Sequence, residues 1–127
     1  MVIPSRVSES GITMVFKPLF PLFPPEALES MKQSGMFALS EPGRLDEVLA
    51  AADLEVHDDN EVESLVVFDD AAAAVRAFVG AGPTALAIGH SGESTVAQAV
   101  QDALGPFTGT DSRVTLPTWY RVVLAQA

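Results

Sequence analysis

The 127-residue sequence contains no cysteine, which excludes disulfide bonds, thiolate metal sites and cysteine nucleophiles together. Its seven basic residues form no basic patch, and this argues against nucleic acid or an anionic membrane surface as a partner. No uncharged apolar run reaches about 18 residues, so a membrane-spanning helix is not expected. The N-terminus has no apolar core behind an early cationic region, so a signal peptide is not expected either. These absences together predict a cytoplasmic protein.

Hydrophobic residues make up 48% of the sequence, which at this length is enough for one folded domain with its own core. Seventeen acidic residues against seven basic ones give a formal net charge of −10. Eleven of the acids fall between Glu41 and Asp70, where Arg44 is the only base. The composition therefore indicates a single acidic, globular domain.

Residues 1–36 differ from the rest in composition, because five of the nine prolines lie within the first 25 positions. The apolar run over 12–16 predicts a short strand. The prolines over 18–25 forbid regular strand pairing and predict a stiff, irregular connection. Pro25 can open a short helix, since its missing N–H costs nothing at the first helical position, and Gly35 ends that helix.

Over residues 37–127 the periodicity predicts mixed α/β structure. The polar run 57–60 predicts a solvated turn, and the valine-rich segment 61–68 a strand. Ser40 is placed to cap the clearest helix. That helix carries one apolar stripe, formed by Leu45, Val48, Leu49 and Ala52.

Asp69 or Asp70 is placed to cap a helix over 71–79, and the glycines and proline that follow stop it. The apolar run 85–88 is a helix or a strand, because its period alone does not decide. A later helix and two late strands, antiparallel near the C-terminus, are predicted over 91–104, 113–116 and 118–125.

The segment 80–85 matches G-x-G-x-x-A, the dinucleotide-binding fingerprint, which needs a strand before it and a helix after it. A helix is predicted before it here, and Pro83 falls within the spacer. We interpret the segment as a helix stop. The oxygen-rich segment 57–63 breaks the calcium-loop pattern, because Val62 stands at the fifth position counted from Asp58. No metal site is predicted.

Gly89–Glu93 resembles the nucleophile elbow G-x-S-x-G, except that Glu93 replaces the glycine that permits the tight turn. Ser91 has an alternative role as the cap of the following helix. A triad also needs a histidine and an acid, yet no histidine follows His90, and His57 lies upstream in a different chain order. Serine hydrolysis at Ser91 is kept only as a remote alternative.

From Phe37 onward the sequence resembles the C-terminal region of class I S-adenosylmethionine-dependent methyltransferases of the small-molecule type. The segment FALSEPGRLDEVLAAADLEV (37–56) is similar to that family's late helix and following strand, with an aromatic residue, a Ser/Pro/Gly turn and an Ala-Gly-Leu exit. Asp53 stands where the family usually has glycine, and aspartate can adopt the left-handed conformation needed there. The resemblance continues through 62–68, 70–104 and 119–124.

The resemblance implies a cofactor site that this sequence does not supply. The family binds S-adenosylmethionine through a glycine-rich loop after its first strand and an acid at the end of its second. Residues 1–36 hold only Gly11 and Gly35, so no residue is assigned to the cofactor. We therefore expect a partial Rossmann-like methyltransferase sheet with an antiparallel C-terminal strand pair and flanking helices, lacking the N-terminal cofactor-binding half.

The expected function is that of a truncated methyltransferase-like domain, related to methyl transfer to a small molecule and not catalytic alone. Candidate substrate-pocket residues are Phe37, from the matched segment, and His90 and Tyr120, from their chemistry. Trp119 and Tyr120 are adjacent on a strand and so point to opposite faces, one to the core and one to a pocket or interface.

A non-catalytic binding or dimerisation module is the alternative. Without the central strands of the family's sheet, a strand edge and apolar helix faces are left uncovered. We therefore expect the chain to pair with itself, or with a partner chain that covers this edge.

Overall fold

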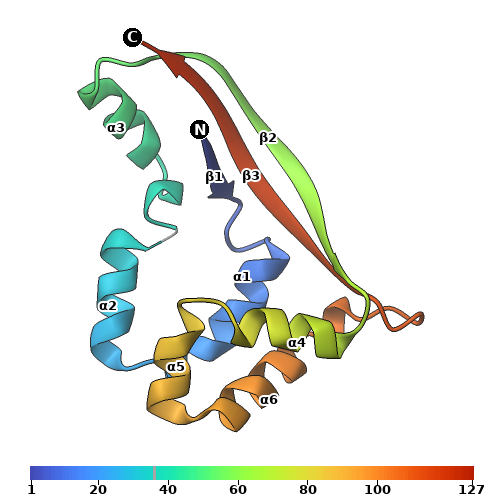
Figure 1. Cartoon of the computed structure of the whole chain (residues 1–127). Helices are drawn as coiled ribbons and strands as arrows, with labels where there is room; N and C mark the ends of the chain where they lie inside the picture. The colour runs from blue at the N-terminus through green and yellow to red at the C-terminus, as the bar shows by residue number, and fades with distance from the viewer. Residues whose placement is uncertain (36) are drawn as a thin grey trace.

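The computed structural model describes residues 1–35 and 37–127. Within them the chain forms six α-helices and a three-stranded antiparallel sheet (Figure 1). Three short 3-10 helices, η1 (Lys17–Leu22), η2 (Ala38–Ser40) and η3 (Gly105–Phe107), join them. The main elements are β1 (Val2–Ser5), α1 (Gly11–Phe16), α2 (Pro25–Ser34), α3 (Arg44–Ala51), β2 (Glu55–Phe68), α4 (Ala71–Val79), α5 (Thr84–Ser91), α6 (Glu93–Ala103) and β3 (Val114–Gln126).

The sheet has the strand order β1-β3-β2, and both pairs are antiparallel. Consequently β1 and β2 run in the same direction on either side of β3. The β2–β3 pair runs from Glu55↔Gln126 to Phe68↔Val114, with one irregularity between Val56 and Asp58. Figure 1 shows this pair as a long ribbon that extends well beyond α4, α5 and α6, with both chain termini at its far end.

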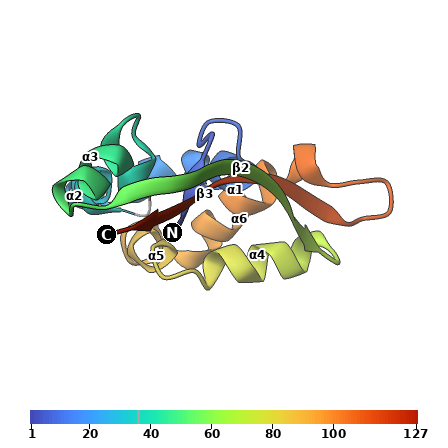
Figure 2. The same ribbon diagram turned by 90° about the horizontal axis from the view of Figure 1, so that it is seen from above.

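Helices cover part of each face of the sheet. Because side chains alternate along a strand, Val114 and Leu116 lie on one face of β3 and Val123 on the other. Val114 and Leu116 belong to the main core, whose other fully buried residues include Val15, Leu19, Ala74, Ala87, Val96 and Val100 in the helices and Leu104 directly after α6. Val123 belongs to a separate cluster on the opposite face. Figure 2 accordingly shows α3 on one side of the ribbon and α4 on the other.

The second cluster consists of Ile3, Leu45, Leu49 and Val123, and it attaches α3 to the sheet. Leu45 and Leu49 are one turn apart, so they lie on the same side of α3. Both are buried, and each contributes about 1.5–3 kcal/mol of hydrophobic stabilisation. Leu45 and Leu49 of the predicted apolar stripe thus form the buried face of α3, whereas Val48 and Ala52 of that stripe are exposed.

The strand predicted over 12–16 is wrong, because this segment is helix α1, which continues into η1. A short apolar run has no decisive period, and here burial against the other helices selects the helix. Pro18 lies at the start of η1, where no N–H is required, so the proline-rich connection begins with a helical turn. The first strand of the chain is β1, earlier in the sequence.

The solvated turn predicted over 57–60 is also wrong, because β2 is continuous from Glu55 to Phe68. Similarly, 113–116 and 118–125 are not separate strands, since β3 runs through Pro117. The backbone N–H and C=O of Val123 both bond to Met1, next to β1. Because these groups alternate in direction along a strand, the backbone N–H and C=O of the other odd-numbered residues of β3, including position 117, also face the β1 side. β1 ends opposite Trp119, so the missing N–H of Pro117 leaves no ladder bond unmade.

Capping agrees with the sequence at α4 but not at α3 or α6. Asp70 caps α4 by accepting a hydrogen bond from the Ala73 N–H at 2.7 Å. Ser40 instead lies in η2, and its hydroxyl donates to the Pro4 carbonyl at 2.6 Å. Ser91 is the last residue of α5, so it does not cap α6. Both helix starts left without these serines follow a glycine with positive φ, at Gly43 and Gly92.

The structure settles two further expectations. The undecided run 85–88 lies within helix α5. Asp53 has a φ of 54°, so it adopts the left-handed conformation expected of it at the exit of α3.

Candidate functional site

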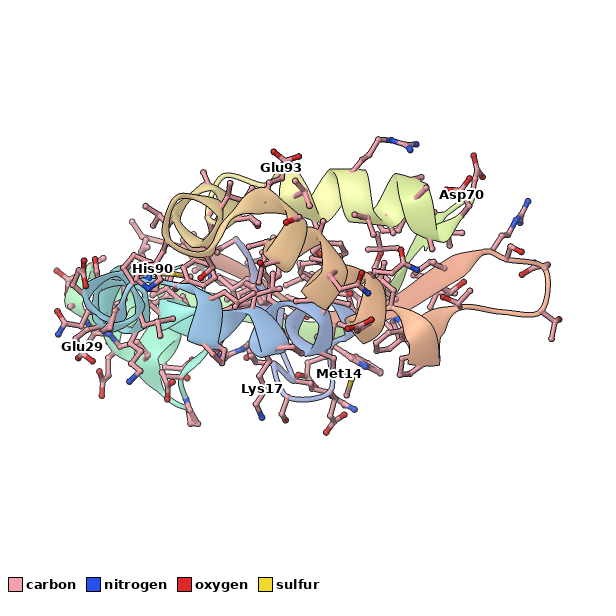
Figure 3. All side chains as sticks on the ribbon, turned by 90° about the horizontal axis from the view of Figure 1, so that it is seen from below. Met14, Lys17, Glu29, Asp70, His90 and Glu93 are labelled. Atoms are coloured by element: carbon pink, nitrogen blue, oxygen red, sulfur yellow. The ribbon has the colours of Figure 1, made fainter. Side chains whose placement is uncertain are left out.

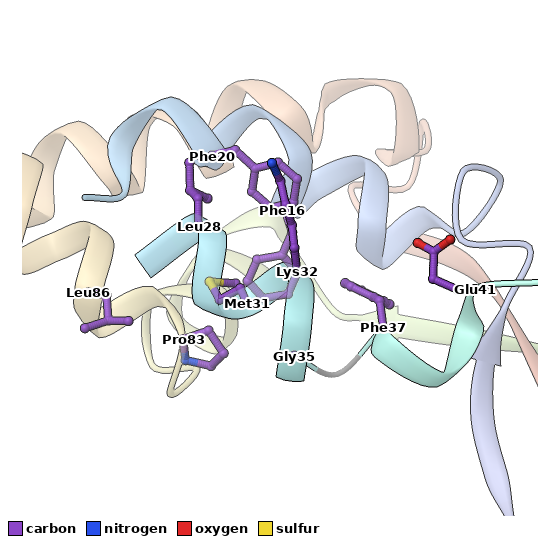
Figure 4. A pocket seen from close by; sticks show the side chains of 10 residues that line it. All are labelled: Phe16, Phe20, Leu28, Met31, Lys32, Gly35, Phe37, Glu41, Pro83 and Leu86. Atoms are coloured by element: carbon purple, nitrogen blue, oxygen red, sulfur yellow. The ribbon is translucent and has the colours of Figure 1, made fainter. Parts of the chain in front are cut away.

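An apolar cavity of about 430 Å³ lies between α1, η1, α2 and α5, next to η2 (Figure 4). Its volume is within the range of roughly 300–1,000 Å³ typical of small-molecule sites. Apart from two charged residues, its walls are apolar or carry no side chain. The residues that line it are Phe16, Phe20, Leu28, Met31, Lys32, Gly35, Phe37, Glu41, Pro83 and Leu86.

Two aromatic walls come from the continuous helical segment formed by α1 and η1. Phe16 ends α1, and Phe20 lies four residues later on the same side. The Phe16 ring packs edge-on against Phe78 with 5.2 Å between centroids, and the Phe20 ring packs edge-on against Phe23 at 6.5 Å. These aromatic contacts hold both rings in place, so this wall is formed before any ligand arrives.

The facing wall comes from α2. Pro25 opens this helix, as the sequence predicts, and Leu28, Met31 and Lys32 share one of its faces at spacings of three and four. Figure 4 shows Met31 directed into the cavity and Lys32 extending from α2 toward Phe16. Methionine is flexible and polarizable, so this wall can adapt to ligands of differing shape.

The remaining walls come from both sides of η2 and from α5. Phe37 and Glu41 flank η2. Pro83 and Leu86 lie at the start of α5, and Leu86 is 50% exposed, so solvent reaches this end of the cavity.

The structure places one of the three predicted pocket residues at this cavity. Phe37 lines it. His90 lies on α5, one turn beyond Leu86 (labelled in Figure 3); it is exposed and does not line the cavity. Tyr120 lies on β3, opposite Pro4 and Val62. These three residues therefore do not form one site.

Sequence reasoning missed the other aromatic walls. The sequence predicts a strand at Phe16 and an irregular connection at Phe20, so it does not indicate that the two rings share one side of a helix. For α2, the predicted helix already contained Leu28 and Met31 at a spacing of three. That spacing, next to an aromatic residue after Gly35, was the available signal for an apolar pocket.

Ser91 occupies a structural position. Its hydroxyl is partly buried and donates to the carbonyl oxygen of Leu22 at 2.8 Å, which ties the end of α5 to η1. Within the described residues neither His57 nor His90 hydrogen-bonds to it. The segment 80–85 follows helix α4 rather than a strand, so its interpretation as a helix stop is confirmed.

A charged network lies on the sheet, away from the cavity. The Arg121 guanidinium donates to Asp59 on β2 and to Asp46 on α3. These hydrogen bonds raise the pKa of Arg121 and lower that of Asp59. On the same face Arg6 lies 4.1 Å from the centre of the Trp119 ring and pairs with Glu61 at 3.0 Å. This network joins elements and forms no enclosed site.

Among residues 1–35 and 37–127, no group of three or more histidine, aspartate or glutamate side chains is positioned to hold a metal ion. No single helix there is long and apolar enough to cross a membrane. The pair α4 and α5 passes that test jointly by length and composition, but it is bent by 87°.

Comparisons with known protein families, with curated proteins and with solved structures found no match to this chain.

Proposed function

We propose that this chain binds a small, largely apolar molecule in the cavity and forms the substrate-side portion of a methyltransferase-like fold. The observation that carries this proposal is the cavity itself, with Phe37 on its wall. Phe37 begins the segment that resembles the late helix and strand of class I methyltransferases. In many proteins a partly open apolar cavity of this size is where a small molecule binds.

The sheet gives further support. Its last strand, β3, runs antiparallel between β1 and β2, which share one direction, and helices lie on both faces. This arrangement is similar to the closing part of a class I methyltransferase sheet. The proposal of a partial Rossmann-like sheet rests on this order of strands and on the sequence resemblance.

The segment after β1 does not fit S-adenosylmethionine. The strand β1 is followed by a single nearby glycine, Gly11, and a Cβ there would lie 3.0 Å from Leu116. The space beside Gly11 is therefore filled by β3 and cannot cradle a cofactor. We propose that methyl transfer takes place only when another polypeptide supplies the cofactor contacts.

One observation favours the alternative, a non-catalytic binding or dimerisation module. In the described part of the chain β2 pairs only with β3, so its outer edge is open along fourteen residues. Val62, Leu65 and Val67 on this strand are 45–59% exposed. An open edge beside apolar side chains is a site for pairing with a second copy or a partner chain.

The cavity is tested with N-phenyl-1-naphthylamine, a neutral apolar dye that fluoresces when it is bound away from water. We expect saturable binding, weakened about five- to tenfold by Phe37→Ala through loss of an aromatic wall. Phe107→Ala removes a ring that is also half-buried but lies outside the lining of this cavity, and it serves as the control. Absence of dye binding, or equal weakening by both variants, contradicts binding in this cavity.

Two further measurements address catalysis and association. Calorimetric titration with S-adenosylmethionine, with and without a cavity ligand, is expected to show no binding to this chain alone. Micromolar binding would contradict the lack of fit at Gly11. Sedimentation at micromolar concentration tests the alternative, because a monomer that retains dye binding favours the small-molecule site over the dimerisation module.

A further inference from the structure

We propose that the cavity ligand is an amphiphile with a single anionic head group, and that the ammonium group of Lys32 pairs with that head group. This inference rests on the proposed function, since it specifies the chemistry of the molecule that the same cavity takes.

The walls require an apolar body. Among the described residues of the lining, side chains able to make hydrogen bonds or ion pairs occur only at Lys32 and Glu41. A polar group placed against the phenylalanines, Met31 or Leu86 would lose its bonds to water and gain none from side chains. The polar part of the ligand must therefore lie at one of the two charged residues.

Lys32 is the residue suited to this role. It is one of the lining residues, and Figure 4 shows its side chain extending from α2 in the direction of Phe16 and Phe20; the side chain is 75% exposed, so its ammonium is in contact with solvent. Lysine commonly lays its carbon chain on apolar surface while its charge stays hydrated. A head group near this ammonium keeps its contact with water while the tail is buried.

The present partner of Lys32 is weakly held. The ammonium lies 3.6 Å from a carboxylate oxygen of Glu29, and both side chains are largely exposed. An exposed ion pair between neighbouring turns contributes little free energy. The lysine ammonium can donate three hydrogen bonds, so it can bind an anionic ligand while losing little free energy from its pairing with Glu29.

Glu41 limits the negative charge of the ligand. It lies on the far side of Phe37 from Lys32 and places a carboxylate at that end of the lining (Figure 4). The chain as a whole also carries a formal charge of −10. One negative charge can be paired at Lys32, whereas a second one would meet repulsion. A monoanionic head group, such as a carboxylate, therefore fits best.

The test compares decanoate with decan-1-ol as competitors of bound N-phenyl-1-naphthylamine at pH 8 and low salt. The two have equally long chains and differ in head-group charge. We expect Lys32→Gln to weaken decanoate binding relative to decan-1-ol binding about three- to tenfold. The measured quantity is the ratio of the decanoate affinity to the decan-1-ol affinity, compared between the variant and the unaltered protein. Differences in solubility, and effects of the substitution that are common to both ligands, cancel in this comparison.

Lys17→Gln is the matched control, since Lys17 is the only other lysine. It projects from η1 into solvent (Figure 3) and does not line the cavity. It is expected to leave the ratio unchanged. Dye binding with an unchanged ratio in Lys32→Gln would overturn this inference while leaving the proposed function standing. Tighter binding of decyltrimethylammonium, abolished by Glu41→Gln, would overturn it in favour of a cationic ligand. Failure of dye binding itself would contradict the proposed function.

Discussion

Arg121 and Asp59 form a two-point contact across the β2–β3 ribbon, with Nε and Nη2 of the arginine 2.9 and 2.6 Å from the two carboxylate oxygens. The same Nη2 donates to Asp46 at 2.9 Å, so one guanidinium joins β3 to both β2 and α3. A planar guanidinium matches a carboxylate in this geometry, which lysine cannot reproduce.

This contact predicts a pH dependence of stability. The hydrogen bonds from Arg121 lower the pKa of Asp59 from its ordinary value of 3.8. A depressed carboxyl pKa stabilises the folded state above the unfolded pKa, and the stabilisation is lost as pH falls below about 4 through the folded pKa. We expect Asp59→Asn to lower stability at pH 7 and to flatten its loss on acidification, measured by urea unfolding at pH 7 and pH 3. Glu63→Gln on the same strand serves as the control, and equal flattening in both would contradict the assignment.

Leu19→Ala is expected to destabilise the protein by about 2–5 kcal/mol, because Leu19 is completely buried in the main core. Leu86→Ala removes the same atoms from a half-exposed position and should cost less than about 1 kcal/mol. Both values come from urea unfolding. Equal effects would show that η1 does not pack into the core as described.

Two glycines should respond to alanine in opposite directions. Gly11→Ala places a Cβ 3.0 Å from Leu116 and 3.1 Å from the Pro117 carbonyl, and this crowding should destabilise by about 1–3 kcal/mol. At Gly89, inside α5, nothing lies within 4 Å of the added methyl group. Gly89→Ala should stabilise by about 0.4–1 kcal/mol through helix propensity. Thermal unfolding of the pair provides the measurement, and effects of the same sign would argue against the close approach of α1 and β3.

Ser91→Ala distinguishes a structural serine from a nucleophile. Loss of the hydrogen bond to the Leu22 carbonyl should destabilise by about 1 kcal/mol. Hydrolysis of p-nitrophenyl acetate should stay at the level of the unaltered protein, and that level should match the background. If the unaltered protein instead hydrolysed the ester above background and Ser91→Ala abolished that activity, the result would support serine hydrolysis at Ser91.

The elements with strong local signals were predictable from the sequence. Asp70 as a capping residue predicts the start of α4, and the spacing of Leu45 and Leu49 predicts α3 and its buried face. The segment 12–16 was not predictable, because its β-branched and aromatic residues favour a strand while burial of Val15 in a helical core selects a helix. The polar residues 57–60 join a strand because β3 supplies backbone partners at long range.

The residues of the candidate site also include some that the sequence could predict and some that it could not. Phe37 could be identified because it begins a segment with a recognisable pattern. Phe16 and Phe20 could not, since their convergence depends on the helical path through Pro18 and on contact with α2. The role of Lys32 depends on the same tertiary arrangement, because in the sequence it is one of two isolated lysines.

Because the Ser40 hydroxyl donates to the Pro4 carbonyl, the β1 edge of the sheet is poorly suited to pairing with a further strand, whereas the β2 edge is open. On the outer side of β1, Pro4 has no N–H to offer and its carbonyl is occupied, which leaves Val2 as the one residue of this strand free to exchange backbone hydrogen bonds there. A polypeptide that supplies cofactor contacts beside β1 must therefore displace Ser40 or dock through side chains. A strand that joins by backbone pairing finds its continuous template at β2, where five carboxylates favour an incoming segment rich in lysine and arginine over a second copy of the same strand.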